Sequence, residues 1–316
     1  MSASDLQQAL DLLKSNYVNA EALNQAELDR GTLEGVLSRL GRGASLLSDP
    51  AADPAEPPTA LYSDIVLGHI GYLRLGDLSR PNLEAMDASL QTFAAKKVDA
   101  AIVDLRAGAI SNDFEMAAEF AKRFCPKGKS IFTLRKRSAR QERNFTCDRE
   151  PAYKGLMIVL ADADTSGPAE ALGGVLRLYD KALLIGAPTA GRAVESSDLK
   201  LASGKVLRVA IGEAVLPEGR QLFPGGLKPD LPVEMSPAEK REVFLQTREK
   251  GIGPFVFETE RPHLNEAALL SGRNPDLEAA EAAQRRGRAA EKPALRDPVL
   301  QRALDVVTSI GIYQKK

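Results

Sequence analysis

The sequence predicts an α/β protein in which helices cover both faces of a largely parallel sheet, with helical segments at the two ends of the chain. Between residues 61 and 235, short apolar segments alternate with helical stretches, which is typical of such a sheet. Before and after this region, apolar residues recur every three or four positions. The 316 residues are 44% hydrophobic, which is enough for a sizeable buried core.

Residues 1–47 are predicted to form an N-terminal helical arm. Leu6, Leu10 and Leu13 follow the helical period, and a second set of leucines repeats it after a short break. Residues 48–60, "SDPAADPAEPPTA", are expected to be a proline-rich linker because closely spaced prolines exclude both helix and sheet.

The central region is expected to hold five strands separated by three helices. A later run is expected to add a hairpin or an edge strand. Strands are predicted within 65–75, 99–106, 130–137, 154–162 and 181–189, helices over 81–97, 112–124 and 167–179, and the hairpin or edge within 204–222. One domain, residues 61–235, accounts for all of these elements.

Residues 236–316 are predicted to form a C-terminal helical arm. Asp297 is a candidate N-cap, and Pro298 is expected at the first helical position. The helix that follows carries a broad apolar stripe, which must be buried. We expect it to pack on the N-terminal helices, within one chain or across a dimer.

Composition and charge exclude several classes of function. With 42 basic and 43 acidic residues the net charge is −1, so no general attraction to nucleic acid or an anionic membrane is expected. The basic run 135–143 is interpreted as a solvated loop or strand edge. Met1 leads into a polar sequence without an export signal, and no apolar run is long enough for membrane insertion.

No cofactor or metal site is expected from the cysteines and histidines. Cys125 and Cys147 lack neighbouring metal ligands and form either one disulfide or two buried thiols. His69 and His263 are both isolated and are interpreted as structural, so a catalytic triad of serine, histidine and aspartate is poorly supported.

The stretch "ADADTSGPAEALGG", residues 161–174, runs from an apolar strand through a small-residue turn into a helix. Such a turn can hold a nucleophile beside the N–H groups that begin a helix. Ser166 is therefore a candidate nucleophile. The alternative interpretation is that Thr165 and Ser166 cap the helix, with Pro168 in its first turn and Glu170 in an early acidic position.

Six segments, in order along most of the chain, resemble the carboxy-terminal processing peptidases, also called tail-specific serine proteases. They are "LLKSNYVNAEALNQAELDRGTLEGVLSRL", "IGYLRLGDLS", "VDAAIVDLR", "FCPKG", "ALLIGAPTAGR" and "LPEGRQLFPGGLKPDLPV". The resemblance implies a ClpP/crotonase-like core with helical dimerisation arms, located in the periplasm or cell envelope. It also implies a serine nucleophile, a neutral lysine as general base and backbone N–H groups that hold the oxyanion.

The residues that the resemblance places at these positions do not suit that chemistry. With Glu170 fixing the register, the family's nucleophile position is Gly167, which carries no oxygen, and its base position is Arg192, which remains protonated. The position that orients the lysine is Ser196. The acidic position on the following helix is Leu178.

Two further departures concern substrate binding. The loop that follows Arg106 contains Gly108 and Ala109 but lacks the family's usual double glycine, so the resemblance predicts an impaired oxyanion hole. Only the proline-rich linker stands where the family usually carries a PDZ domain. Arg192 could bind a carboxylate such as a peptide C-terminus, or could form a structural ion pair with Glu195 or Glu170.

The leading interpretation is a catalytically degenerate relative of these peptidases that acts by binding. Its expected partners are protein or peptide chains, an active paralogue among them, and a second copy through the terminal helices. The alternative is an active serine endopeptidase that uses Ser166 as a shifted nucleophile, with Lys181 or Lys200 as the nearest lysines in sequence. An acyl-CoA enzyme of the crotonase type is a third class.

Overall fold

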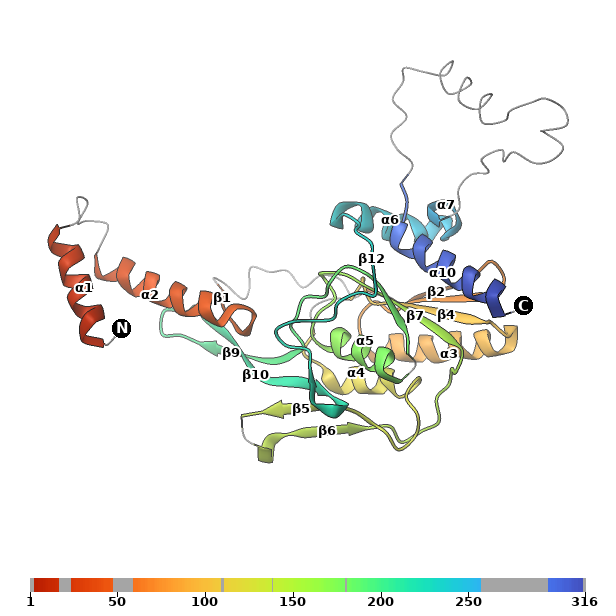
Figure 1. Cartoon of the computed structure of the whole chain (residues 1–316), viewed down its shortest axis with the longest axis horizontal. Helices are drawn as coiled ribbons and strands as arrows, with labels where there is room; N and C mark the ends of the chain where they lie inside the picture. Colours follow the sequence, from red (N-terminus) through yellow and green to blue (C-terminus); the bar gives the residue numbers. More distant parts are fainter. Residues whose placement is uncertain are drawn as a thin grey trace, which may run out of the picture.

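The computed structural model contains two sheets, of which one forms a layered core and the other extends away from it (Figure 1). It describes residues 3–16, 24–47, 59–108, 111–137, 139–179, 181–256 and 295–314. His263 and Ala109 lie outside the described residues.

The core sheet has the strand order β12-β8-β7-β4-β3-β2, and every pair in it is parallel except β2 with β3. Its strands are β2 (Tyr62–Val66), β3 (Ile70–Arg74), β4 (Ala100–Asp104), β7 (Leu156–Ala161), β8 (Leu183–Gly186) and β12 (Leu231–Pro232). The predicted parallel sheet is confirmed. β3 and β4 are buried along their whole length, as expected for a sheet that is covered on both faces.

The single strand expected over 65–75 is instead a hairpin. Leu67 and Gly68 both adopt positive φ in the turn between β2 and β3, at 53° and 74°. A leucine in this region is uncommon, so sequence pattern alone did not indicate the turn. His69 is at this turn, where its Nδ1 lies 2.7 Å from the carbonyl oxygen of Leu67.

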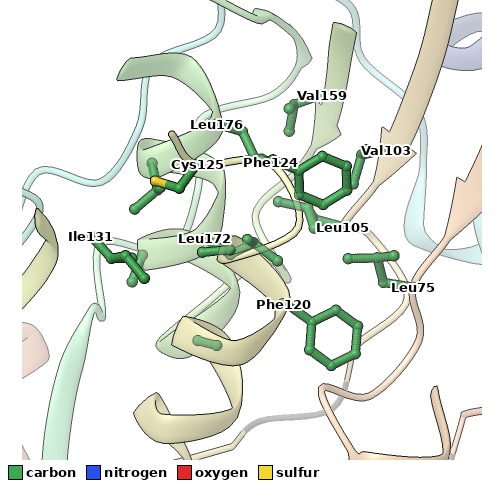
Figure 2. Packing of buried hydrophobic residues seen from close by; sticks show 14 of the residues in the cluster. Leu75, Val103, Leu105, Phe120, Phe124, Cys125, Ile131, Val159, Leu172 and Leu176 are labelled. Carbon is green, nitrogen blue, oxygen red and sulfur yellow. The ribbon is translucent and has the colours of Figure 1, made fainter. Parts of the chain in front are cut away.

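Three helices cover the first face of the core sheet: α3 (Arg80–Lys96), α4 (Phe114–Ala121) and α5 (Pro168–Tyr179). All three were expected from the sequence. Figure 2 shows how closely α4 and α5 pack, with Phe120 and Phe124 lying among leucine and valine side chains. The largest core cluster includes residues at the ends of β4 and β7, the strands that lead to the candidate site.

The second face is covered by α6 (Pro237–Lys250), α7 (Gly253–Val256) and α10 (Pro298–Gln314). The apolar stripe of α10 contacts the strands of the core sheet through Val299, Leu300, Ala303, Leu304 and Val307. The expectation that this stripe packs on the N-terminal helices is therefore wrong. The sheet has a second apolar face of its own, and α10 covers it.

A buried ionic cluster anchors α10 to the sheet. The Arg106 guanidinium donates to Asp104 and, at 3.1 and 2.8 Å, to both carboxylate oxygens of Asp297. Asp297 also accepts from the N–H of Leu300 at 2.9 Å, which confirms it as the N-cap. Burial alone would raise the pKa of Asp104, but the guanidinium of Arg106 outweighs it and lowers this pKa below its ordinary value.

The second sheet is antiparallel and is built mainly by chain segments from outside the βα alternation. Its strands are β1 (Ala44–Leu47), β5 (Ser130–Lys136), β6 (Arg143–Thr146), β9 (Val194–Lys200), β10 (Val206–Leu216) and β11 (Arg220–Gln221). The hairpin expected within 204–222 is present as β10 and β11. However, β5 pairs with β10 and β6 rather than joining the parallel sheet as predicted.

The N-terminal helices α1 (Ala3–Asn16) and α2 (Gln25–Leu40) extend from the core together with β1, β9 and β10 (Figure 1). The two predicted helices are confirmed, although residues 44–47, expected to be helical, form β1 and pair with β10. No residue of α2 is buried. Five large apolar side chains of α1 and α2 are about half exposed: Leu6, Leu12, Leu13, Val36 and Leu40.

Cys125 and Cys147 are both buried free thiols, which decides between the two alternatives left by the sequence. The Cys147 thiol donates to the carbonyl oxygen of Cys125 at 3.2 Å. Among the described residues, no helix is both long and apolar enough to cross a bilayer.

Candidate active-site region

The turn between β7 and α5 is held by hydrogen bonds to the side chain of Asp162. Its Oδ1 accepts from the N–H groups of Asp164 and Thr165, at 3.0 and 3.2 Å. Thr165 is buried, and its hydroxyl donates to the carbonyl oxygen of Leu105 at the end of β4. Thr165 therefore joins two neighbouring strand ends instead of capping α5, which corrects the capping role expected for it.

Helix α5 begins at Pro168, so Pro168 occupies the predicted first position and Gly167 precedes it. Ser166 is partly buried, and its carbonyl oxygen accepts from the N–H of Ala169 at 3.2 Å. Ser166 and Thr165 both lie outside the helix.

Glu170 lies in the first turn of α5 and joins it to the loop at 187–192. Its carboxylate is fully buried and accepts from the Thr189 hydroxyl. It also accepts from the N–H groups of Gly191 and Arg192, at 2.6 Å in both cases. No cation is needed, because these three donors satisfy the charge. The loop is thereby held against the start of α5, so that residues 167 and 192 are neighbours.

Gly167 has φ +56°, a backbone conformation that residues other than glycine rarely adopt. A Cβ built on Gly167 would lie 3.1 Å from the carbonyl oxygen of Ser111 and 3.8 Å from that of Arg192. The backbone of the loop after β4 therefore occupies the space into which a nucleophile at position 167 would extend.

The same loop is joined to β9 by the side-chain amide of Asn112. Its Oδ1 accepts from the N–H of Ser196 at 2.8 Å, and its Nδ2 donates to the carbonyl oxygen of Ser196 at 2.9 Å. Gly108, earlier in this loop, packs closely on Gly76, since a Cβ there would lie 3.1 Å from the Gly76 carbonyl oxygen. Asn112 is not predicted from the sequence, because only its contact with Ser196, 84 positions later in the chain, distinguishes it from other loop asparagines.

The structure brings together some of the predicted site residues and separates others. Gly167, Arg192 and Ser196 lie around one loop, but Leu178 is close to the far end of α5, about 16 Å along the helix axis from Gly167. The Arg192 side chain is exposed, and Glu170 contacts only its backbone. Glu195 instead pairs with Lys136 and Arg143, so the predicted ion pair of Arg192 with either glutamate is wrong.

Lys181, Lys200 and Lys240 are not placed to activate Ser166. Lys181 follows the C-terminal end of α5, about 18 Å along the helix from its start, and Lys200 ends β9, about 20 Å along that strand from Val194. Lys240 of α6 does reach the turn, but its ammonium group pairs with Asp162 at 2.5 Å and Asp164 at 2.7 Å. With its ammonium group paired to two carboxylates of the turn, Lys240 is suited to holding the turn in place.

A family model for peptidase family S41 matches residues 69–233, which include both strand ends, the turn and the loop at 187–192. The chain belongs to peptidase family S41. The resemblance to carboxy-terminal processing peptidases is thereby confirmed, and the ClpP/crotonase-like α/β core is the fold of this S41 chain.

Two carboxyl-terminal-processing peptidases are similar to this chain over part of their own length. Carboxyl-terminal-processing peptidase 2 of Arabidopsis thaliana is 26% identical over 202 residues, which cover 64% of this chain and 38% of the relative. The carboxyl-terminal-processing protease of Synechocystis is 24% identical over 165 residues, covering 52% of this chain and 38% of the relative. This S41 chain therefore matches less than two fifths of the length of these relatives.

A solved structure from Parabacteroides merdae, described as a peptidase, shares the fold with a TM-score of 0.56. It covers 77% of this S41 chain and 85% of its own length at 16% identity.

Proposed function

We propose that this S41 protein is catalytically degenerate and acts by binding protein or peptide chains. The observation that carries the proposal lies at Gly167: the position has no side-chain oxygen, and a Cβ added there would lie 3.1 Å from the Ser111 carbonyl oxygen. The neighbouring position carries Arg192, whose guanidinium cannot accept a proton at neutral pH. Ser196 and Leu178 complete the set of replaced positions.

The test is a peptidase assay on unfolded protein substrates. The unmodified chain is compared with a Gly167→Ser/Arg192→Lys variant, and Arg192→Lys alone serves as the control because it cannot supply a nucleophile. We expect no cleavage by the unmodified chain or the control. Cleavage by the unmodified chain would refute the proposal if it persists after further purification and in the presence of inhibitors of contaminating proteases.

The alternative function is an active serine endopeptidase with Ser166 as the nucleophile. Lys181 and Lys200 are remote and Lys240 is paired with two carboxylates, so none of these three lysines is an available base for Ser166. A fluorophosphonate probe distinguishes the two functions. Stoichiometric labelling that is lost in Ser166→Ala would support the peptidase, whereas the degenerate protein is expected to remain unlabelled.

Arg192 is proposed to bind carboxylates of a partner chain. Its side chain is exposed and has no ion pair with the two nearby glutamates, Glu170 and Glu195, which are satisfied by other groups. A guanidinium in this state can accept a carboxylate in bidentate geometry. Weaker binding of peptides with a free C-terminus to Arg192→Gln, with no change for amidated peptides, would support this role.

The N-terminal arm, residues 1–47, is proposed to bind a second copy of the chain. Its half-exposed leucines and Val36 form apolar surface that the described part of the chain leaves uncovered. We expect Leu12→Glu/Val36→Glu to reduce the molar mass measured by light scattering to that of a monomer. An unchanged mass would exclude the arm as the interface.

A further inference from the structure

A groove of about 490 Å³ lies between α4 and β6. Its lining comes from α4, from the residue that precedes it and from the end of β6: Asp113, Glu115, Met116, Ala118, Glu119, Lys122, Asn144, Phe145, Thr146 and Asp148. The volume is within the range of ligand-binding clefts.

β6 is the last strand in its sheet, so no strand among the described residues pairs with its outer edge. Beyond its end, the Cys147 N–H donates to Lys129 and the Cys147 carbonyl oxygen accepts from Gly128, so Cys147 faces β5. Backbone direction alternates along an antiparallel strand. The N–H and C=O groups of Thr146 and Asn144 therefore face away from β5, toward the groove.

The lining of the groove is acidic. Four carboxylates line it, Asp113, Glu115, Glu119 and Asp148, against one lining cation, Lys122. Glu119 already pairs with Lys122 at 2.7 Å and with Arg123 at 3.3 Å. Two of the four carboxylates are largely solvated, because the side chains of Glu115 and Asp148 are both 70% exposed. Glu115 pairs at present with the Arg143 guanidinium at 2.7 Å, and Asp148 pairs with Lys122 at 3.2 Å.

We propose that this groove binds an extended basic segment of a partner protein, which adds as a strand to the outer edge of β6. The proposal deepens the binding function given above, because it assigns the partner's chemistry and its place on the fold. Backbone hydrogen bonds to Asn144 and Thr146 supply the pairing, and cationic side chains contact the carboxylates of α4. The apolar floor, Met116 and Phe145, accommodates the stems of those side chains.

The spacing of the carboxylates predicts the sequence pattern of the partner. Glu115 and Glu119 are one helical turn apart, about 6 Å between their Cβ atoms. In an extended strand, side chains two residues apart lie on the same face at about 6.6–6.8 Å. A Lys or Arg at every second position therefore matches the two glutamates, and the residues between them face the other way.

The test is fluorescence anisotropy with the full chain and a labelled peptide, acetyl-TKVKVKT-amide. We expect saturable binding that weakens as salt is raised, since the contacts on the rim are ionic. Two control peptides separate the contributions. TEVEVET reverses the charge, and a version of the lysine peptide that is N-methylated at alternate residues retains the charge but cannot pair as a strand. Neither control is expected to bind.

Two variants place the binding on this groove. Glu115→Gln/Asp148→Asn removes two exposed charges and should weaken binding about threefold to tenfold, as expected for two solvated ion pairs. The matched control is Glu34→Gln/Glu242→Gln, which removes two exposed carboxylates elsewhere and should leave affinity unchanged. Thr146→Pro deletes one outward N–H at an edge position that tolerates proline and should abolish binding while the unfolding temperature is maintained.

Several results would overturn the inference. The first is no binding at millimolar peptide, and the second is binding of the N-methylated peptide as tight as that of the lysine peptide. The third is a loss of affinity in the control variant equal to that in Glu115→Gln/Asp148→Asn. The fourth is a dimer that Thr146→Pro dissociates, which would assign the groove to a second copy. Peptidase activity in the unmodified chain would refute the proposed loss of catalysis, yet it would leave the anisotropy result standing.

Discussion

Replacing Gly167 by alanine tests whether the position that we predict to be the family's nucleophile position can hold any side chain in this protein. At φ +56°, an L-residue costs about 1–2 kcal/mol relative to its usual backbone conformations. The added Cβ would also lie 3.1 Å from the Ser111 carbonyl oxygen, in a buried position, and overpacking of this kind costs about 1–3 kcal/mol. We therefore expect Gly167→Ala to lower the free energy of unfolding by about 2–5 kcal/mol.

The measurement is urea unfolding followed by circular dichroism, with Gly128→Ala as the matched control. Gly128 has φ +80° and no atom within 4 Å of the added Cβ, so it reports the backbone cost alone. The difference between the two variants isolates the contact with the loop after β4. If Gly167→Ala is as stable as the unmodified chain, or loses no more than Gly128→Ala, the argument that the Ser111 loop occupies this position is wrong.

Three further predictions concern the core and its titration. Asp297→Asn keeps the helix cap but leaves a buried guanidinium half-paired, and it should cost about 3–5 kcal/mol in urea unfolding, with a loss below 1 kcal/mol contradicting the anchoring role. Burial raises the pKa of Tyr62 and of Tyr153 to about 12. The folded state thus holds these phenolic protons more tightly than the unfolded state, so the stabilisation present below pH 10 should be lost as the pH rises toward 12. The measurement is the absorbance of ionised tyrosine at 295 nm. Ionisation of all tyrosines by pH 11 would contradict the prediction. Cys125 and Cys147 should react with Ellman's reagent slowly in the folded protein and fully in urea, whereas rapid native labelling would contradict their burial.

Local pattern was sufficient for much of the fold. The helices α3, α4 and α5 and four of the five expected strand segments of the parallel sheet follow from apolar period and from proline and cap positions, which act between near neighbours in sequence. The identities at 167 and 192 are also properties of the sequence alone. No arrangement of the chain can give a glycine a side-chain oxygen or an arginine a neutral side chain at pH 7.

Tertiary structure decided which surfaces meet. An apolar stripe specifies that α10 must be buried but not where, and the second face of the sheet, together with the Arg106 anchor, decided that α10 belongs to the core. The apolar pattern of β5 is compatible with either sheet, and pairing with β10 assigned it to the second.

The same distinction applies to the site. The sequence by itself determined the identities of Gly167 and Arg192, and with them the prediction that the family's nucleophile and base are replaced in this S41 protein. The positive φ of Gly167, the Ser111 carbonyl oxygen beside it and the Asn112 amide on β9 depend on contacts between segments far apart in the chain. Long-range contacts of this kind are set by packing and hydrogen-bond geometry, which no local sequence pattern encodes.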